Sequence, residues 1–198
     1  KEQDFGNCGL ACNQVFLYLM LSGQAITEKQ LSKIGLSKEI VMDEKRFLDW
    51  SINNGYANWN VSSDWLGSTF DFQRQKFFSD LGIQTTYNDK PKANEIIQAV
   101  KNNKGVQIAI TAGQDIDDNG IIITYGHAVT AQQVYKDKNS GKTYVVINNS
   151  GWSPNGLAPT ATQAVAIDDL MKMQPRIIVT EPKLWGIHSV KADRPSNK

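Results

Sequence analysis

The first part of the chain carries apolar residues at helical spacing. In the segment FGNCGLACNQVFLYLM (5–20), five residues fall on one helix face, and Gly23 comes shortly after the last of them. These residues are Cys8, Cys12, Val15, Phe16 and Leu19. Because residues three and four positions apart share a face, the spacing predicts an amphipathic helix that starts near Cys8 and ends at Gly23.

More helices are expected in the same half of the chain. The segment TEKQLSKIG starts with Thr27 and places Gln30 three residues later, which is the spacing of a capping box. The segments 42–53 and 68–81 repeat the helical pattern, and a loop rich in Trp and Asn separates them.

From Ile83 onward, short strand patterns replace the long helical ones. The expected strands are IQTTY (83–87), VQIAI (106–110), HAVTAQQVY (127–135), TYVVIN (143–148), AVAI (164–167) and RIIVT (176–180). A helix over 91–103 and a short helix over 168–173 interrupt them.

Helices followed by an antiparallel sheet predict an α+β fold. The length favours a single domain over residues 1–198. We expect a helical lobe over about 1–82, a sheet lobe over about 83–191 and a polar tail over 192–198.

Two of the expected strands form a predicted antiparallel hairpin, because the segment KDKNSGK between them has strong turn chemistry. With Tyr135 opposite Lys142, the register places His127 opposite Ser150 and next to Asn149. An imidazole and a side-chain amide are then expected at one end of two adjacent strands.

Composition and charge exclude several classes of function. The 21 basic and 20 acidic residues give a net charge of +1, which lacks the electrostatic pattern of a nucleic-acid-binding protein. No apolar run reaches the length of a membrane span. Two cysteines exclude a disulfide framework, and with only His127 and His188 the usual zinc-ligand spacings are absent.

The segment DIDDNG (115–120) fits the first half of a calcium-binding EF-hand loop. Gly126, however, stands where that loop needs a glutamate, so a polar loop before the His127 strand is favoured. We expect neither a metal nor a cofactor.

Cys8 is a candidate nucleophile because of its position at a helix start. A helix N-terminus favours the thiolate, which is the reactive form of cysteine. Gly6 and Gly9 leave room for an extended substrate beside the sulfur. The alternative is a buried core cysteine, and this is the favoured interpretation of Cys12, one turn deeper on the apolar face.

A thiolate nucleophile needs a base, and His127 is the plausible candidate. Asn149, beside it in the predicted hairpin, could accept the second ring N–H and orient the imidazole. Asn148 competes for this role, but alternation along the strand puts Asn149 on the same face as the buried apolar residues.

These motifs resemble those of papain-like cysteine peptidases. The segment NCGLAC (7–12) is similar to the nucleophile segment of the bacterial bacteriocin-leader (double-glycine) peptidases. The segments GHAVTA (126–131) and YVVINNSGW (144–152) are similar to the papain histidine strand and its Asn-Ser-Trp-Gly segment. The resemblance spans most of the chain. It implies a papain-like fold in which the nucleophile helix of an N-terminal helical lobe packs on a C-terminal antiparallel sheet lobe.

By this resemblance Cys8 is the nucleophile, His127 is the general base and acid, and Asn149 orients His127. Gln3 resembles the oxyanion-hole glutamine, although it precedes Cys8 by five positions where the family usually has six. Trp152 falls one place later than the shielding tryptophan of the family.

The resemblance implies a cysteine protease that cleaves protein or peptide substrates through a thioester. The same groups would serve a glutamine deamidase or a transglutaminase-like toxin, and an inactive binding module is a third alternative. Because seven residues precede Cys8, we expect a catalytic module of a larger bacterial protein, such as a secreted effector or toxin. An immunity or inhibitor protein is then an expected partner, and nucleic acid and membrane are not. The sequence leaves the compartment undetermined.

Overall fold

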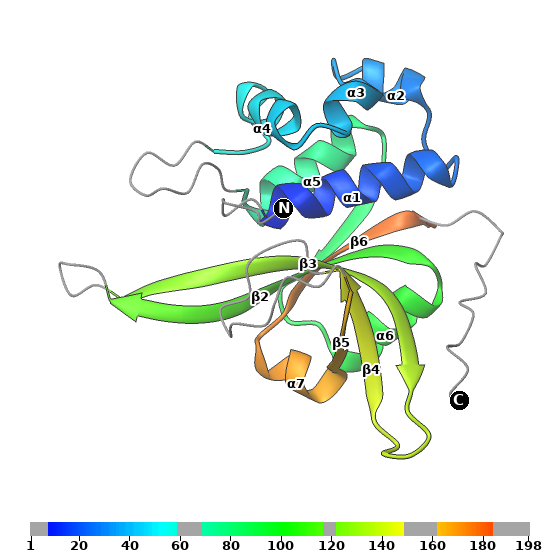
Figure 1. Cartoon of the computed structure of the whole chain (residues 1–198), viewed down its shortest axis with the longest axis vertical. Helices are drawn as coiled ribbons and strands as arrows, with labels where there is room; N and C mark the ends of the chain where they lie inside the picture. Colours follow the sequence, from blue (N-terminus) through cyan, green and yellow to red (C-terminus); the bar gives the residue numbers. More distant parts are fainter. Residues whose placement is uncertain (1–7, 59–68, 117–121, 149–161, 184–198) are drawn as a thin grey trace.

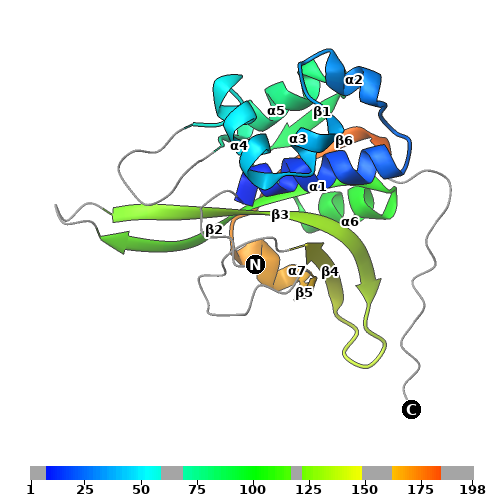
Figure 2. The same ribbon diagram turned by 45° about the horizontal axis from the view of Figure 1, so that its top comes forward.

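The computed structural model describes residues 8–58, 69–116, 122–148 and 162–183 (Figure 1). In this part of the chain, helices α1 to α5 lie on one side of an antiparallel sheet, and α6 and α7 lie on the other side (Figures 1 and 2). The arrangement of separate helical and antiparallel regions confirms the α+β prediction. None of the described helices is long and apolar enough to cross a membrane.

The helical region contains each helix that the sequence predicts there and one more. Its helices are α1 (Cys8–Ser22), α2 (Glu28–Ser32), α3 (Lys38–Val41), α4 (Glu44–Asn53) and α5 (Asp71–Asp80). The predicted capping box is present at α2, where Thr27 Oγ1 accepts from the Gln30 N–H and Gln30 Oε1 accepts from the Thr27 N–H. The sequence did not predict α3, because a single turn is too short to show a helical period.

The sheet has six strands in the order β1-β6-β2-β3-β4-β5, and every neighbouring pair is antiparallel. Its strands are β1 (Thr85–Asn88), β2 (Lys104–Ile116), β3 (Ile122–Lys136), β4 (Thr143–Asn148), β5 (Gln163–Ala166) and β6 (Arg176–Lys183). The remaining helices are α6 (Ala93–Lys101) and α7 (Ile167–Lys172).

Strands β2 and β3 are longer than predicted and form an extended ribbon (Figure 1). Their pairing continues to Ile116 opposite Ile122, so Asp115 and Ile116 lie in a strand where a polar loop was predicted. The prediction was wrong there because backbone pairing does not require apolar side chains. Residues 117–120 of the predicted loop lie outside the described residues.

The predicted hairpin exists as β3 and β4, but its predicted register is wrong. Tyr135 lies opposite Tyr144, because Lys136 and Thr143 form the closing pair and the loop is shifted one residue further along the chain than assumed. Asp137 closes this loop: its N–H donates to the Lys142 carbonyl at 2.9 Å, and its carboxylate accepts from the Ser140 N–H at 2.9 Å.

A bulge between Ala131 and Gln133 then changes the register once more. Thr130 lies opposite Asn148, whereas the predicted register puts Thr130 opposite Ile147. The described pairing ends there, and both Ser150 and Asn149 lie outside the described residues.

The described residues form two hydrophobic cores. The first lies within the helical layer, among α1 to α5, and includes Ile83 just before β1. The second lies between the sheet and the helices α6 and α7. Between α1 and the sheet the contact is partly polar, since Gln107 Nε2 of β2 donates to Asn13 Oδ1 at 2.8 Å. Both side chains are buried, so this hydrogen bond fixes α1 on the face of the sheet that carries the candidate site.

Candidate active site

Cys8 is the first residue of α1, and this helix lies against β3 (Figure 2). The Ala128 N–H donates to the Cys8 sulfur at 3.3 Å, although 120 residues separate the two in sequence. Cys8 as a whole residue is half-buried. A backbone donor aimed at a sulfur atom stabilises the anionic thiolate more than the neutral thiol.

His127, the residue before Ala128 in β3, is buried and interacts with the same sulfur. Burial raises the pKa of Cys8, but a hydrogen bond with His127 and the charge of His127 act in the opposite direction. The Ala128 N–H and the charge of Arg74 lower it further, and the net pKa of Cys8 lies below its ordinary value of 9.0. The structure thus brings together the two residues that the sequence selected as nucleophile and base.

Cys12 is a useful contrast within the same helix. It is 1% exposed, and burial, together with the nearby Cys8, raises its pKa to about 12. At neutral pH this thiol is protonated and closed off from solvent, which confirms the prediction of a core cysteine.

The other predicted site residues, Gln3 and Asn149, lie outside the described residues, as do Trp152 and His188. Asn148, which competes with Asn149 in the sequence, is the last residue of β4 and is half-buried opposite Thr130.

The sequence did not select Arg74 of α5, although its side chain lies against the first turn of α1. Arg74 is 3% exposed, and a Cβ atom built at Gly9 would lie 3.4 Å from its Nη1. The same Cβ would lie 2.4 Å from Cγ2 of Thr69. We expected Gly9 to leave room for a substrate, but in the structure it leaves room for Thr69 and Arg74.

Asp71, one turn before Arg74 on α5, holds three donors from different elements. Arg74 Nη2 forms an ion pair with one carboxylate oxygen. The other oxygen accepts from Arg176 Nε of β6 at 2.8 Å and from the Tyr87 hydroxyl of β1 at 3.1 Å. Asp71 therefore connects the Arg74 guanidinium to β1 and β6, which are the edge strand of the sheet and its neighbour.

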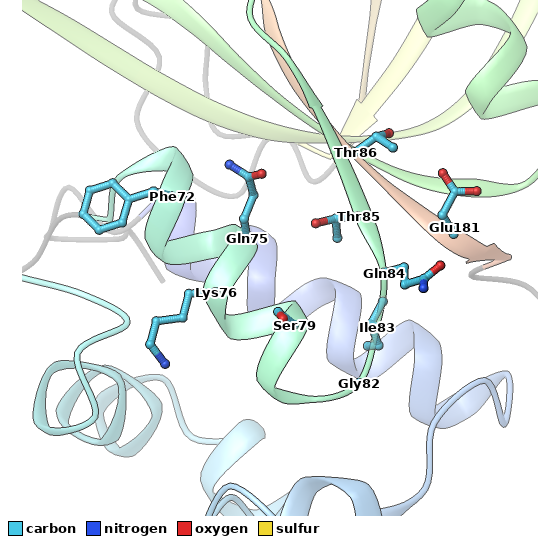
Figure 3. A pocket seen from close by; sticks show the side chains of 10 residues that line it. All are labelled: Phe72, Gln75, Lys76, Ser79, Gly82, Ile83, Gln84, Thr85, Thr86 and Glu181. Atoms are coloured by element: carbon cyan, nitrogen blue, oxygen red, sulfur yellow. The ribbon is translucent and has the colours of Figure 1, made fainter.

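A groove of about 1010 Å³ lies between α5 and β1, apart from this thiol site (Figure 3). Its lining residues are Phe72, Gln75, Lys76, Ser79, Gly82, Ile83, Gln84, Thr85, Thr86 and Glu181. Phe72 at its rim is exposed and stacks on Phe70, with ring centroids 5.7 Å apart. Neither Cys8 nor His127 lines this groove.

Neither a scan of protein-family models nor a search of curated proteins gives a match for this chain. The geometry of the described residues therefore carries the functional argument.

Proposed function

We propose that the protein is a cysteine hydrolase of the papain-like fold that cleaves peptide bonds, with Cys8 as nucleophile and His127 as general base and acid. One observation carries the proposal. The sulfur of Cys8 accepts from the Ala128 N–H at 3.3 Å and interacts with the adjacent His127, while its pKa is lowered despite burial. A nucleophile, a base and a lowered thiol pKa are the requirements of thiolate catalysis.

In the proposed reaction the Cys8 thiolate attacks the carbonyl carbon of the scissile bond. The leaving amine takes the proton that His127 holds, and an acyl thioester remains on the sulfur. Water then attacks the thioester carbonyl while His127 accepts a proton from this water, the C–S bond breaks, and the acid product leaves with the Cys8 thiolate and protonated His127 regenerated. The Ala128 N–H fixes the position of the sulfur before the attack.

The papain-like part of the proposal is supported by the order of the elements. A helix that starts at the nucleophile lies across an antiparallel sheet, and the histidine follows on a central strand of that sheet. By the resemblance of the sequence, Asn149 would orient His127, and Gln3 would supply an oxyanion-hole donor.

Covalent labelling tests the proposal. We expect iodoacetamide and an epoxide inhibitor of the E-64 type to modify Cys8 and leave Cys12 unmodified at neutral pH, with fragment-ion mass spectrometry locating the label. The His127→Ala variant should label Cys8 more slowly, and Cys12→Ala should label Cys8 at the wild-type rate. Equal labelling of the two thiols, or a rate at Cys8 that does not depend on His127, would contradict the proposal.

A second experiment defines the bond that is cleaved. With a protein substrate, a peptidase gives two fragments, and Cys8→Ala should lose several orders of magnitude in rate. A substrate chain that stays whole and gains about one mass unit would show deamidation of a side-chain amide and would contradict the peptidase assignment.

A further inference from the structure

Among the described residues, the buried charge of Arg74 is not fully neutralised. Arginine is rarely buried to this degree unless it is paired, and Arg74 is 3% exposed. Its carboxylate partner Asp71 is shared with Arg176, so two guanidinium groups face one carboxylate. Its Nε has no hydrogen-bond partner among the described residues. Burying an incompletely compensated charge costs several kcal/mol, so its position requires a physical reason.

The position of the guanidinium suggests that reason. Arg74 Nη1 would lie 3.4 Å from a Cβ at Gly9, the residue directly after Cys8. The first turn of α1 contains no acidic residue that could take the charge. Among the described residues at this end of the helix, the anion that can form is therefore the thiolate of Cys8.

We propose that Arg74 is a positioning residue that stabilises the thiolate of Cys8 with a fixed, buried positive charge. The inference rests on the proposed function of Cys8 as a nucleophile and extends it. In the part of the chain that the structure describes, the ionisable groups that act on this sulfur or are acted on by it are His127 on β3, Arg74 on α5 and Cys12 on α1. The charge of Arg74 acts together with His127 to lower the pKa of Cys8.

The surroundings of Arg74 hold its charge in place. Asp71 anchors the guanidinium, and Arg176 and the Tyr87 hydroxyl anchor Asp71 from two strands. Gly9 permits the close approach, since any side chain there would meet Thr69 and Arg74. A charge fixed in advance favours an anion without the cost of reorganising around it.

The test is the pH dependence of Cys8 alkylation by iodoacetamide, measured as a second-order rate for folded protein. Arg74→Met removes the charge and keeps most of the side-chain volume. At about pH 6 we expect it to lower the rate roughly three- to tenfold and to move the profile towards higher pH, because a nearby opposite charge favours ionisation. Arg74→Lys keeps the charge and should stay closer to the wild type.

Lys76→Met is the matched control. Lys76 is another cation of α5, but it is exposed and paired with Asp80, so its removal should leave the Cys8 profile unchanged. Circular dichroism and thermal unfolding verify that each variant is folded. Should Arg74→Met fail to fold, Arg74→Gln replaces it, because an amide can still donate to Asp71 but carries no charge.

The outcomes separate this inference from the proposed function. A folded neutral variant at Arg74 with the wild-type profile would overturn the inference while leaving Cys8 and His127 as nucleophile and base. A folded Arg74→Lys variant displaced as far as the neutral variant would overturn it too. A wild-type Cys8 with the profile of an ordinary thiol, unaffected by His127→Ala, would instead overturn the proposed function.

Discussion

Replacing Gly9 by alanine tests the packing beside Cys8. The new Cβ would lie 2.4 Å from Cγ2 of Thr69 and 3.4 Å from Nη1 of Arg74. Carbon atoms pack at about 3.5–4.0 Å, so the helix or Thr69 must move by about 1 Å. Overpacking of this kind costs about 1–3 kcal/mol. The better helix propensity of alanine offsets up to about 1 kcal/mol. We therefore expect a net loss of roughly 1 kcal/mol in the free energy of unfolding and slower alkylation of Cys8.

A double-mutant cycle with Thr69→Ser isolates this contact. Serine lacks Cγ2 and keeps the hydroxyl that donates to the Tyr56 carbonyl at 3.0 Å. In the Thr69→Ser background, Gly9→Ala should cost nothing or stabilise the protein, as measured by urea unfolding. Gly126→Ala is the control, because among the described residues its Cβ would come near the Ile110 carbonyl alone, at an ordinary contact distance of 3.8 Å. An equal cost of Gly9→Ala in both backgrounds would refute the reasoning.

Two further predictions concern charge and burial at the same site. Burial raises the pKa of Asp71, but the hydrogen bond from Arg176 and the charges of Arg74 and Arg176 lower it below 3.8. The carboxylate therefore stabilises the fold above that pH, and this stability is lost as the pH falls through the folded-state pKa. Asp71→Asn should lose about 3 kcal/mol at neutral pH in urea unfolding, and a difference that persists in strong acid would count against this account. Cys12→Ala removes a buried thiol and should cost about 1 kcal/mol, while Cys8 keeps its alkylation rate. Loss of labelling at Cys8 in that variant would show that Cys12 is reactive.

The helices and strands that the sequence predicted best are those whose pattern matches their burial. In β4 the prediction gave the observed bounds, Thr143–Asn148, because Val145 and Ile147 are buried and alternate with less buried residues. At the ends of the β2–β3 ribbon the prediction failed, because polar residues such as Asp115 have the sequence pattern of a loop. Backbone pairing there is a tertiary property that a local pattern does not encode.

The register of the β3–β4 hairpin differs from the prediction because the side chain of Asp137 stabilises a loop that spacing alone does not indicate. The segment KDKNSGK correctly predicted a turn, but the two residues expected to flank it do not pair. Asp137 accepts hydrogen bonds from the N–H groups of Asn139 and Ser140, and this stabilises a loop over 137–142, one residue further along the chain than predicted. The bulge after Ala131 adds a second shift. Neither feature has a strong sequence pattern, so the position of Asn149 relative to His127 could not be obtained by counting.

Cys8 and His127 could be selected from the sequence because the chain offers few alternatives. It contains 2 cysteines and 2 histidines, and only Cys8 combines a helix start with neighbouring glycines. Their contact is a tertiary property, since Ala128 and Cys8 are 120 residues apart. The choice of residue types followed from chemistry, and the contact follows from the packing of α1 on β3.

The sequence contains a sign that Arg74 is buried, but only the fold shows what the residue contacts. It shares a helix face with Phe77 and Phe78, both fully buried, so a charged residue occupies a position of the apolar stripe. Such a residue indicates a buried ionic contact, and Asp71 at the preceding turn is a natural partner. The sequence could not show that Gly9 would bring this cation beside Cys8, or that Cys12 would lie in an environment that raises its pKa to about 12. The pKa values of the two cysteines on this helix are therefore shifted in opposite directions, and the groups that lower the pKa of Cys8 come from β3 and α5.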